Sequence, residues 1–289
     1  MPSAASGPSG SSAPPRITMA ELAGRYDGFL LDSFGVLVDG RGALPGAAAM
    51  LAELDRRGRP YHIVTNDASR RAATSAARFR RFGLDIAAER ILGSGDLLAP
   101  YFAANGLVGA RCLVLGTDDS RALVGEAGGR VCAIDPGGDY DAVVVCDDDG
   151  FPFLDGINAA LSALFRALDA GRSVHMVLPN PDLVFPAGGG AFGFTSGAIG
   201  TLLEVALARR YPEQPPEFTR LGKPHPPLFQ EAMRRLGGGR LLMIGDQLET
   251  DIAGAIACGL DAALLVTGVT RWSERATGVV PTYLLDSLW

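Results

Sequence analysis

The sequence lacks several features that would place this protein in other classes. No stretch approaches the roughly 18 consecutive apolar residues of a membrane-spanning helix, and no run of Lys or Arg indicates a surface for nucleic acid or anionic lipid. The four cysteines show no CxxC spacing and lie within or beside apolar runs, which is typical of small buried residues in a reducing compartment. No internal repeat of solenoid period is present. These absences favour a cytoplasmic globular protein that binds neither nucleic acid nor a membrane.

The N-terminus has neither the basic nor the apolar segment of a signal peptide. Residues 2–15 are only Pro, Ser, Ala and Gly, and we expect a disordered tail over residues 1–17. The whole chain of 289 residues is 47% hydrophobic and 20% charged, enough for more than one globular unit. Its net charge of −6 still permits phosphate binding where a few cations and a metal converge.

Apolar runs of strand length alternate with helical segments after the tail. This alternation predicts an α/β fold with a doubly wound parallel sheet. Ser69 is a candidate N-cap for an Arg-rich helix over Arg70–Phe82. The expected strands include 28–31, 59–64, 90–92, 111–115, 130–134, 142–146, 173–178, 241–244 and 262–266, and the other expected helices include 46–57, 156–169, 198–209, 226–236 and 252–259.

The pattern is interrupted between two hinge-like stretches. One is Ser94-Gly95, and the other is the proline-rich segment 211–218, which has the composition of a linker. Between them lies a second α/β set that contains the glycine bend 188–190. We therefore expect an inserted domain over residues 96–217 within a discontinuous core formed by residues 18–95 and 218–289.

Polar residues follow several of the predicted core strands. Asp32 ends the apolar run Gly28–Leu31, Thr65-Asn66-Asp67 ends the next strand, and Gly245-Asp246 ends a later one. Ligands in open α/β sheets bind just beyond the carboxyl ends of the strands. Each of these residues also has a simpler structural interpretation. Asp246 and Asp251 could be a turn residue and an acid at a helix N-terminus. Lys223 of Gly222-Lys223-Pro224 could be a surface residue, and Thr65 could be an ordinary strand end.

Four motifs in this order resemble the haloacid dehalogenase (HAD) superfamily. They are Asp32-x-x-Gly, Thr65-Asn66, Gly222-Lys223-Pro224 and Gly245-Asp246-x-x-x-x-Asp251, and the late insertion together with the stretches 180–186 and 221–229 resembles subfamily IIA, the nitrophenyl-phosphatase and pyridoxal phosphate phosphatase-like group. The resemblance implies a Rossmann-like core with a C2-type cap, and it covers about residues 25–289.

The resemblance also implies a set of residue roles. Asp32 would be the nucleophile that forms an aspartyl-phosphate, and Mg²⁺ would be held by Asp32, the backbone carbonyl of Phe34, Asp246 and Asp251. Thr65 and Lys223 would act on the phosphate in catalysis. The implied substrate-binding residues are Thr65, Asn66, Asp67, Lys223 and Asp182, and Asp148, Asn180 and Phe185 are further candidates of the cap that would face the core.

The first motif departs from the phosphatase pattern Asp-x-Asp. Phe34 stands where the second Asp protonates the leaving oxygen and later activates water. General acid–base catalysis is typically worth ~10²–10⁴ in rate, so esters with poor alkoxide leaving groups should suffer most. Asp67 and Asp39 are candidate substitutes, although the sequence favours a solvated loop acid for each, and His225 is a candidate for ligand contact.

Three functions follow from this reading. The first is a Mg²⁺-dependent phosphatase-like hydrolase of small phosphorylated metabolites, restricted or slow because of Phe34. The second is a catalytically silent protein that binds a phosphorylated ligand. The third is a 2-haloacid dehalogenase, a group in which an aromatic residue at this position is common but metal carboxylates are not needed. Caps of this kind also imply a homodimer.

Overall fold

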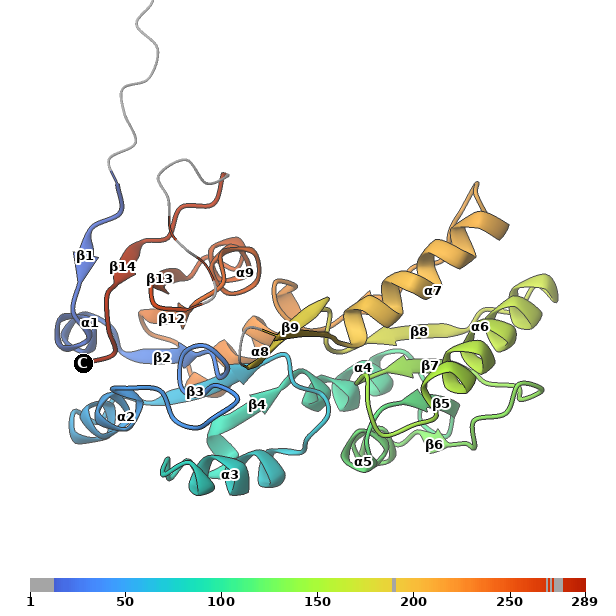
Figure 1. Cartoon of the computed structure of the whole chain (residues 1–289), viewed down its shortest axis with the longest axis horizontal. Helices are drawn as coiled ribbons and strands as arrows, with labels where there is room; N and C mark the ends of the chain where they lie inside the picture. Colours follow the sequence, from blue (N-terminus) through green and yellow to red (C-terminus); the bar gives the residue numbers. More distant parts are fainter. Residues whose placement is uncertain (1–12, 189–190, 269, 271, 273–277) are drawn as a thin grey trace, which may run out of the picture.

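The molecule is built on two parallel sheets that lie end to end along its long axis (Figure 1). The computed structural model describes residues 13–188, 191–268, 270, 272 and 278–289. Residues 1–12 of the expected tail and most of the glycine bend 188–190 lie outside the described residues. Within the described part, no helix is long and apolar enough to cross a membrane.

The first sheet has seven strands, and every pair of neighbours is parallel. Its order is β1 (Arg16–Ile17), β14 (Tyr283–Leu285), β13 (Asp261–Leu265), β12 (Leu241–Gly245), β2 (Gly28–Leu31), β3 (Tyr61–Thr65) and β4 (Ile91–Gly93). The first sheet thus begins at Arg16 and Ile17, which the sequence analysis assigns to the disordered tail; their pairing with β14 corrects that expectation.

Helices cover both faces of this sheet, as the alternation of apolar residues predicts. Phe29 and Leu31 of β2 face one core cluster and Leu30 faces the other. The first cluster is covered by α1 (Met19–Arg25), α2 (Ala47–Arg56) and α3 (Ala72–Arg81), and the second by α8 (Pro226–Leu236) and α9 (Ala253–Ala257). The doubly wound α/β core is therefore confirmed.

The second sheet comes from the inserted segment and is also entirely parallel. Its order is β11 (Thr219–Arg220), β8 (His175–Leu178), β7 (Ala142–Val145), β5 (Arg111–Leu115) and β6 (Arg130–Val131). The helices of this half are α4 (Leu98–Ala104), α5 (Asp118–Glu126), α6 (Phe153–Asp169) and α7 (Ser196–Arg210), and an antiparallel hairpin joins β9 (Val184–Gly188) to β10 (Ala191–Phe194).

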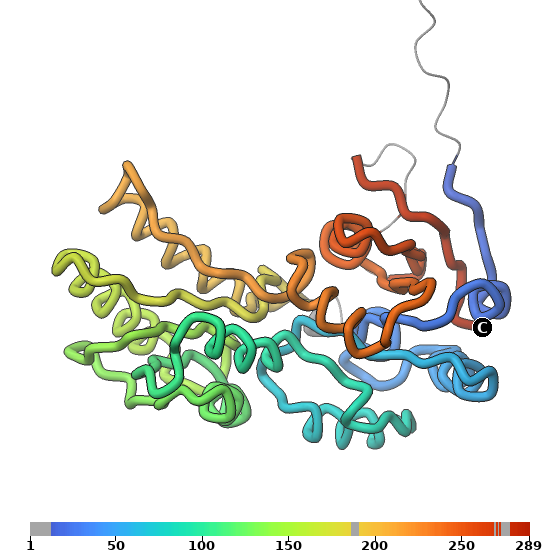
Figure 2. The backbone as a smooth tube through the Cα atoms, turned by 180° about the vertical axis from the view of Figure 1, so that it is seen from behind, coloured from blue at the N-terminus to red at the C-terminus, as the bar shows by residue number. Residues whose placement is uncertain are grey.

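The chain passes between the two halves twice, and the view from behind shows both passages (Figure 2). It leaves the first sheet after β4 and returns after β11, so the second sheet extends to Arg220, beyond the proline-rich segment. One hydrophobic cluster continues across the junction, since Leu97 and Phe102 pack with Leu30 and Leu123.

Two local expectations need correction. Ser69 is not the N-cap of α3: the helix begins at Ala72 with Arg71 at the cap, and the Ser69 hydroxyl instead donates to Asp67 Oδ1 at 2.6 Å. Asp251 does not open a helix either. It lies inside a π-helical turn, Leu248–Ile252, that leads directly into α9.

Candidate active site

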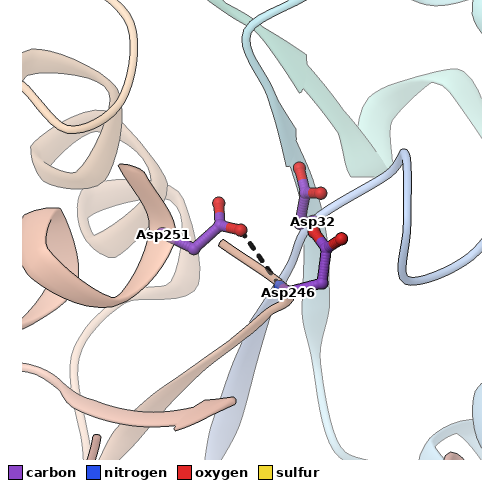
Figure 3. Close-up of side chains that lie close together, drawn as sticks. All are labelled: Asp32, Asp246 and Asp251. Carbon is purple, nitrogen blue, oxygen red and sulfur yellow. Dashed lines mark hydrogen bonds between the residues drawn. The ribbon is translucent and has the colours of Figure 1, made fainter. Parts of the chain in front are cut away.

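Three carboxylates converge at the carboxyl ends of β2 and β12. These strands are neighbours, so Asp32 follows one strand and Asp246 the other, and the Asp32 backbone N–H donates to Ile244 O at 2.9 Å. The carboxylate of Asp251 accepts the backbone N–H groups of Asp246 and Gln247, both at 3.2 Å. Figure 3 shows the three side chains grouped together, with Asp251 on the adjoining helical segment.

The spacing and burial of these carboxylates suit a metal ion. One oxygen of each of Asp32, Asp246 and Asp251 lies within 4.8 Å of the others, and all three residues are buried. Carboxylate oxygens are the ligands that hard divalent cations prefer. The sequence-predicted metal residues are thus brought together, and Phe34, whose carbonyl is the fourth predicted ligand, lines the cavity above them.

Glycines create the room for this cluster. Gly35 has φ +92°, and a Cβ built on it would overlap the carboxylate of Asp246. A Cβ on Gly245 would overlap the side chain of Asp251 in the same way. The first and last motifs therefore need glycine because the carboxylates occupy the space beside the backbone.

Lys223 supplies the positive charge of the cluster and is the only lysine of the sequence. Its Nζ donates to Asp32 Oδ1 at 2.5 Å and to Asp251 Oδ1 at 2.7 Å, and the Lys223 residue is only 3% exposed. Burial by itself would lower the pKa of Lys223, but Asp251 and Asp32 outweigh it and raise the pKa. The ammonium is therefore held charged between two carboxylates.

Acidic groups dominate the buried cluster. The carboxyl groups of Asp32, Asp246 and Asp251 lie together, and the ammonium of Lys223 pairs with two of them, Asp32 and Asp251. Burial raises the pKa of Asp32 well above its usual value, Lys223 opposes this rise, and Asp251 and Asp246 add to it. A bound divalent cation would favour the ionised forms of these three carboxyl groups, so the residues present fit a metal ion.

The side chain of Asn66 fixes the backbone of Lys223. Asn66 Nδ2 donates to Lys223 O at 2.9 Å, and the Lys223 N–H donates to Asn66 Oδ1 at 2.7 Å. Asn66 Nδ2 also donates to Asp182 Oδ1 at 2.9 Å, and Asp182 belongs to the inserted half. A Cβ on Gly222 would lie 2.5 Å from Asn66 Oδ1, which leaves room only for glycine before Lys223.

The loop after β3 carries the other predicted substrate residues. Thr65 lines the cavity and its Oγ1 accepts the Asp67 N–H at 3.3 Å. Asp67 also lines the cavity, but its carboxylate is occupied by donors: it accepts Ser69 N at 2.8 Å, the Ser69 hydroxyl at 2.6 Å and Arg70 Nη1 at 2.8 Å. Asp67 therefore orders the start of this loop by accepting these three hydrogen bonds.

A cavity of about 370 Å³ opens above the cluster between the two halves. Its walls include the four candidates that the sequence indicated in the insertion, namely Asp148, Asn180, Asp182 and Phe185. Asp39 and His225 are not among the described residues that line it. Asp39 instead accepts the N–H groups of Arg41 and Gly42 within its hairpin.

Sequence reasoning missed several lining residues. The most informative is Asp147, which follows β7 as Asp32 follows β2, so the rule of polar residues at strand ends, applied to the insertion, would have found it. No comparable signal indicates the two arginines, Arg70 and Arg78, because they lie in an Arg-rich helical segment that reads as a solvated face.

Comparison with known families agrees with this geometry. Residues 29–130 match the family model of haloacid dehalogenase-like hydrolases, and residues 220–289 match a second HAD-hydrolase-like model. The two matches lie on either side of most of the insertion. The chain belongs to the haloacid dehalogenase superfamily, in its subfamily IIA, and its class is that of the phosphoric monoester hydrolases.

Individual relatives support the same placement. Chronophin of Bos taurus is 30% identical over 93% of both chains, and D-glycerol 3-phosphate phosphatase of Mycobacterium tuberculosis is 31% identical over 92% of this chain and 71% of its own. A solved structure from Cytophaga hutchinsonii, described as a "possible sugar phosphatase", has a TM-score of 0.83 at 30% identity, and covers 96% of this chain and 99% of its own. Glycerol phosphate phosphatase of M. tuberculosis, solved with calcium, has a TM-score of 0.77 at 30% identity, with 92% of this chain and 75% of its own covered.

Proposed function

We propose that this protein is a Mg²⁺-dependent phosphatase that hydrolyses small phosphorylated metabolites through an aspartyl-phosphate on Asp32. The observation that carries the proposal is the buried cluster of Asp32, Asp246 and Asp251 with Lys223 at the floor of a cavity of small-molecule size. The relatives named as glycerol phosphate phosphatases support a small phosphate ester as the substrate class.

Each residue of the floor has a distinct role in this proposal. The Asp32 carboxylate attacks phosphorus in line, and Lys223 offsets negative charge on the nucleophile and the phosphate. Thr65 donates its hydroxyl to a phosphate oxygen, aided by backbone N–H groups of the loop that contains Asn66 and Asp67. Asp246, Asp251, Asp32 and the Phe34 carbonyl hold the metal, which supplies charge neutralisation for the transferred phosphoryl group when bound.

The domain assignment follows the same logic. We propose that the expected core, residues 18–95 and 218–289, is the catalytic part once β1 is added to it and β11 is assigned to the inserted half, and that the insertion, expected over residues 96–217, forms a C2-type cap. The support is that the floor residues lie at the edge of the first sheet, whereas Asn180, Asp182 and Phe185 reach the cavity from the insertion. In this arrangement the cap contacts the part of the substrate that is not transferred.

Phosphate release from p-nitrophenyl phosphate tests the proposal directly. This leaving group needs little protonation, so the wild-type protein should hydrolyse it despite Phe34, with Mg²⁺ and not after chelation by EDTA. Asp32→Asn should lower the rate roughly a thousandfold or more because the nucleophile is lost. An Asp32→Asn protein that retained the wild-type rate would rule out the aspartyl-phosphate.

A second candidate is a silent phospho-ligand-binding protein, and Phe34 is the observation that favours it. The ring of Phe34 is half-buried against the apolar residues of the first core cluster, where it offers no proton. Binding of beryllofluoride with Mg²⁺, but no turnover of any ester in a broad panel of phosphate monoesters, would select this function instead.

We also propose a cytoplasmic location and a homodimer. The four cysteines Cys112, Cys132, Cys146 and Cys258 are free, as expected in a reducing compartment. The hairpin of β9 and β10 exposes Phe192 and Phe194, which are 70% and 73% exposed and suit a contact between two caps. A monomeric mass by light scattering at micromolar concentration would contradict the dimer.

A further inference from the structure

We propose that Asp147, which lies on the inserted half, is the catalytic general acid and base that replaces the carboxyl group missing at Phe34. This inference rests on the phosphatase function proposed above and names the group that protonates the leaving oxygen. It would explain how a chain with the motif Asp32-Ser33-Phe34-Gly35 can act on esters whose leaving group needs a proton.

Asp147 lies on the wall of the cavity that the nucleophile opens into. It follows β7, and its N–H donates to Leu115 O at 3.2 Å at the end of the neighbouring strand β5. In-line transfer puts the nucleophile and the leaving oxygen on opposite sides of phosphorus. Asp32 approaches from the core, so the leaving oxygen faces the inserted half, to which Asp147 belongs.

Hydrogen bonds fix the part of the inserted half near Asp147 to the loop after β3. The Thr117 hydroxyl donates to Ser69 O at 2.6 Å and the Ser120 hydroxyl donates to Ala68 O at 2.9 Å. Arg121 donates to the carbonyl oxygens of Gly116 and Gly150, which joins the turn after β5 to the loop after β7 that contains Asp147. These bonds hold the Asp147 loop close to the phosphate-binding loop.

The surroundings of Asp147 raise the pKa of its carboxyl group to near neutrality. Burial, then Asp148 on the same loop and Asp67 on the loop after β3, raise the pKa of Asp147 from 3.8 to about 7, while Arg70 opposes this rise. Of the neighbouring charges, Arg70 is paired with Asp67 at 2.8 Å. A general acid works best when its pKa lies near the working pH.

Three other carboxyl groups have oxygens that accept hydrogen bonds from neighbouring groups. Asp67 accepts three hydrogen bonds, from Ser69 and Arg70. Asp182 accepts the amide of Asn66, although burial also raises its pKa. Asp39 makes its bonds within its own hairpin.

The proposed steps balance. In the first, Asp32 Oδ bonds to phosphorus, the bond from phosphorus to the ester oxygen breaks, and the Asp147 carboxyl gives its proton to that oxygen, which leaves as an alcohol. In the second, water attacks phosphorus, its proton passes to the Asp147 carboxylate, and the bond to Asp32 breaks. Phosphate leaves, and both aspartates return to their starting forms.

Two esters whose leaving groups differ in their need for a proton test this role. With Mg²⁺, Asp147→Asn should lower kcat/KM for an alkyl phosphate such as glycerol 3-phosphate by about 10²–10⁴-fold, and for p-nitrophenyl phosphate by less than about threefold. The wild-type kcat/KM for the alkyl ester should fall as the pH rises through about 7, and this fall should be absent in Asp147→Asn. Asp155→Asn, which removes the same charge from an exposed residue of α6 in the same half, should leave kcat/KM for both esters unchanged.

Stability gives a second measurement that does not depend on turnover. Because the folded protein binds the Asp147 proton more tightly than the unfolded chain, the stability that Asp147 contributes is lost as the pH rises from 3.8 to about 7, so the Tm of the wild-type protein should fall relative to that of Asp147→Asn over this range. The assignment would be overturned if a folded Asp147→Asn protein lost activity equally on both esters, or if it kept the wild-type kcat/KM for the alkyl ester. Failure of the wild-type protein on p-nitrophenyl phosphate would instead overturn the phosphatase function on which it rests.

Discussion

The two halves of the molecule are built alike but use their strand ends differently. Both have an all-parallel sheet flanked by helices, and in both an apolar strand ends on aspartate: β2 at Asp32 and, two residues beyond its last residue, β7 at Asp147. In the core, the aspartate is buried beside Lys223 and two further carboxylates. In the inserted half, Asp147 lies on the cavity wall without an ammonium beside it.

This difference shows that the position of a residue in the fold does not decide its chemistry. Burial raises the pKa of both aspartates. At Asp32, Lys223 opposes this rise through a direct ion pair, whereas at Asp147 the opposing cation is Arg70, which is itself paired with Asp67. The two aspartates therefore meet different charges, and the ion pair with Lys223 suits Asp32 to act as the nucleophile.

The largest expected effect comes from filling the space beside the core carboxylates. Gly35→Ala should abolish Mg²⁺-dependent activity, because its Cβ would overlap the carboxylate of Asp246, and the metal affinity measured by calorimetry should fall with it. Gly42→Ala is the matched control: Gly42 also has a positive φ, +158°, but no heavy atom lies within 4 Å of its added Cβ. Equal losses in the two variants would mean that backbone strain, and not Asp246, explains the effect.

Restoring the missing acid in the core should remove the need for the one in the inserted half. Phe34→Asp should raise kcat/KM for alkyl phosphates by up to ~10²–10⁴-fold, with a small change for p-nitrophenyl phosphate. In the Phe34→Asp background, Asp147→Asn should then lower kcat/KM for alkyl phosphates much less than it does in the wild-type protein. Additive effects of the two substitutions, measured as a double-mutant cycle in kcat/KM, would argue against a shared role.

A smaller effect is expected where the two halves meet at Asn66. Asp182→Ala removes the acceptor that orients the Asn66 amide, which in turn holds the backbone of Lys223, so kcat should fall roughly ten- to a hundredfold with little change in KM. Asp182→Asn keeps an acceptor oxygen and should restore most of the rate. A rise in KM with unchanged kcat would show instead that Asp182 binds the substrate directly, as the sequence analysis expects.

Much of the core could be read from local sequence because its strands are short, apolar and buried on both faces. Such runs have few other conformations that hide their side chains, and Asp32, Thr65 and Asp246 then follow at their ends. The prediction that Ser69 is the N-cap of α3 was wrong for a local reason. The Ser69 hydroxyl donates to Asp67, two residues before it, and not to the helix. The two-residue strands β1 and β11 are too short to have a pattern, and only their neighbours define them.

By itself, the sequence determined the alternation of strands and helices, the insertion, and the motifs that contain Asp32, Lys223 and Asp246, since each depends on residue types within a few positions of one another. Only the tertiary structure decided which charges meet. The pairing of Lys223 with Asp32, the clamp of Asn66 on the Lys223 backbone, and the position of Asp147 on the cavity wall all join residues far apart in the chain. Burial and charge pairing depend on distance in space, so local sequence cannot set the protonation of these aspartates.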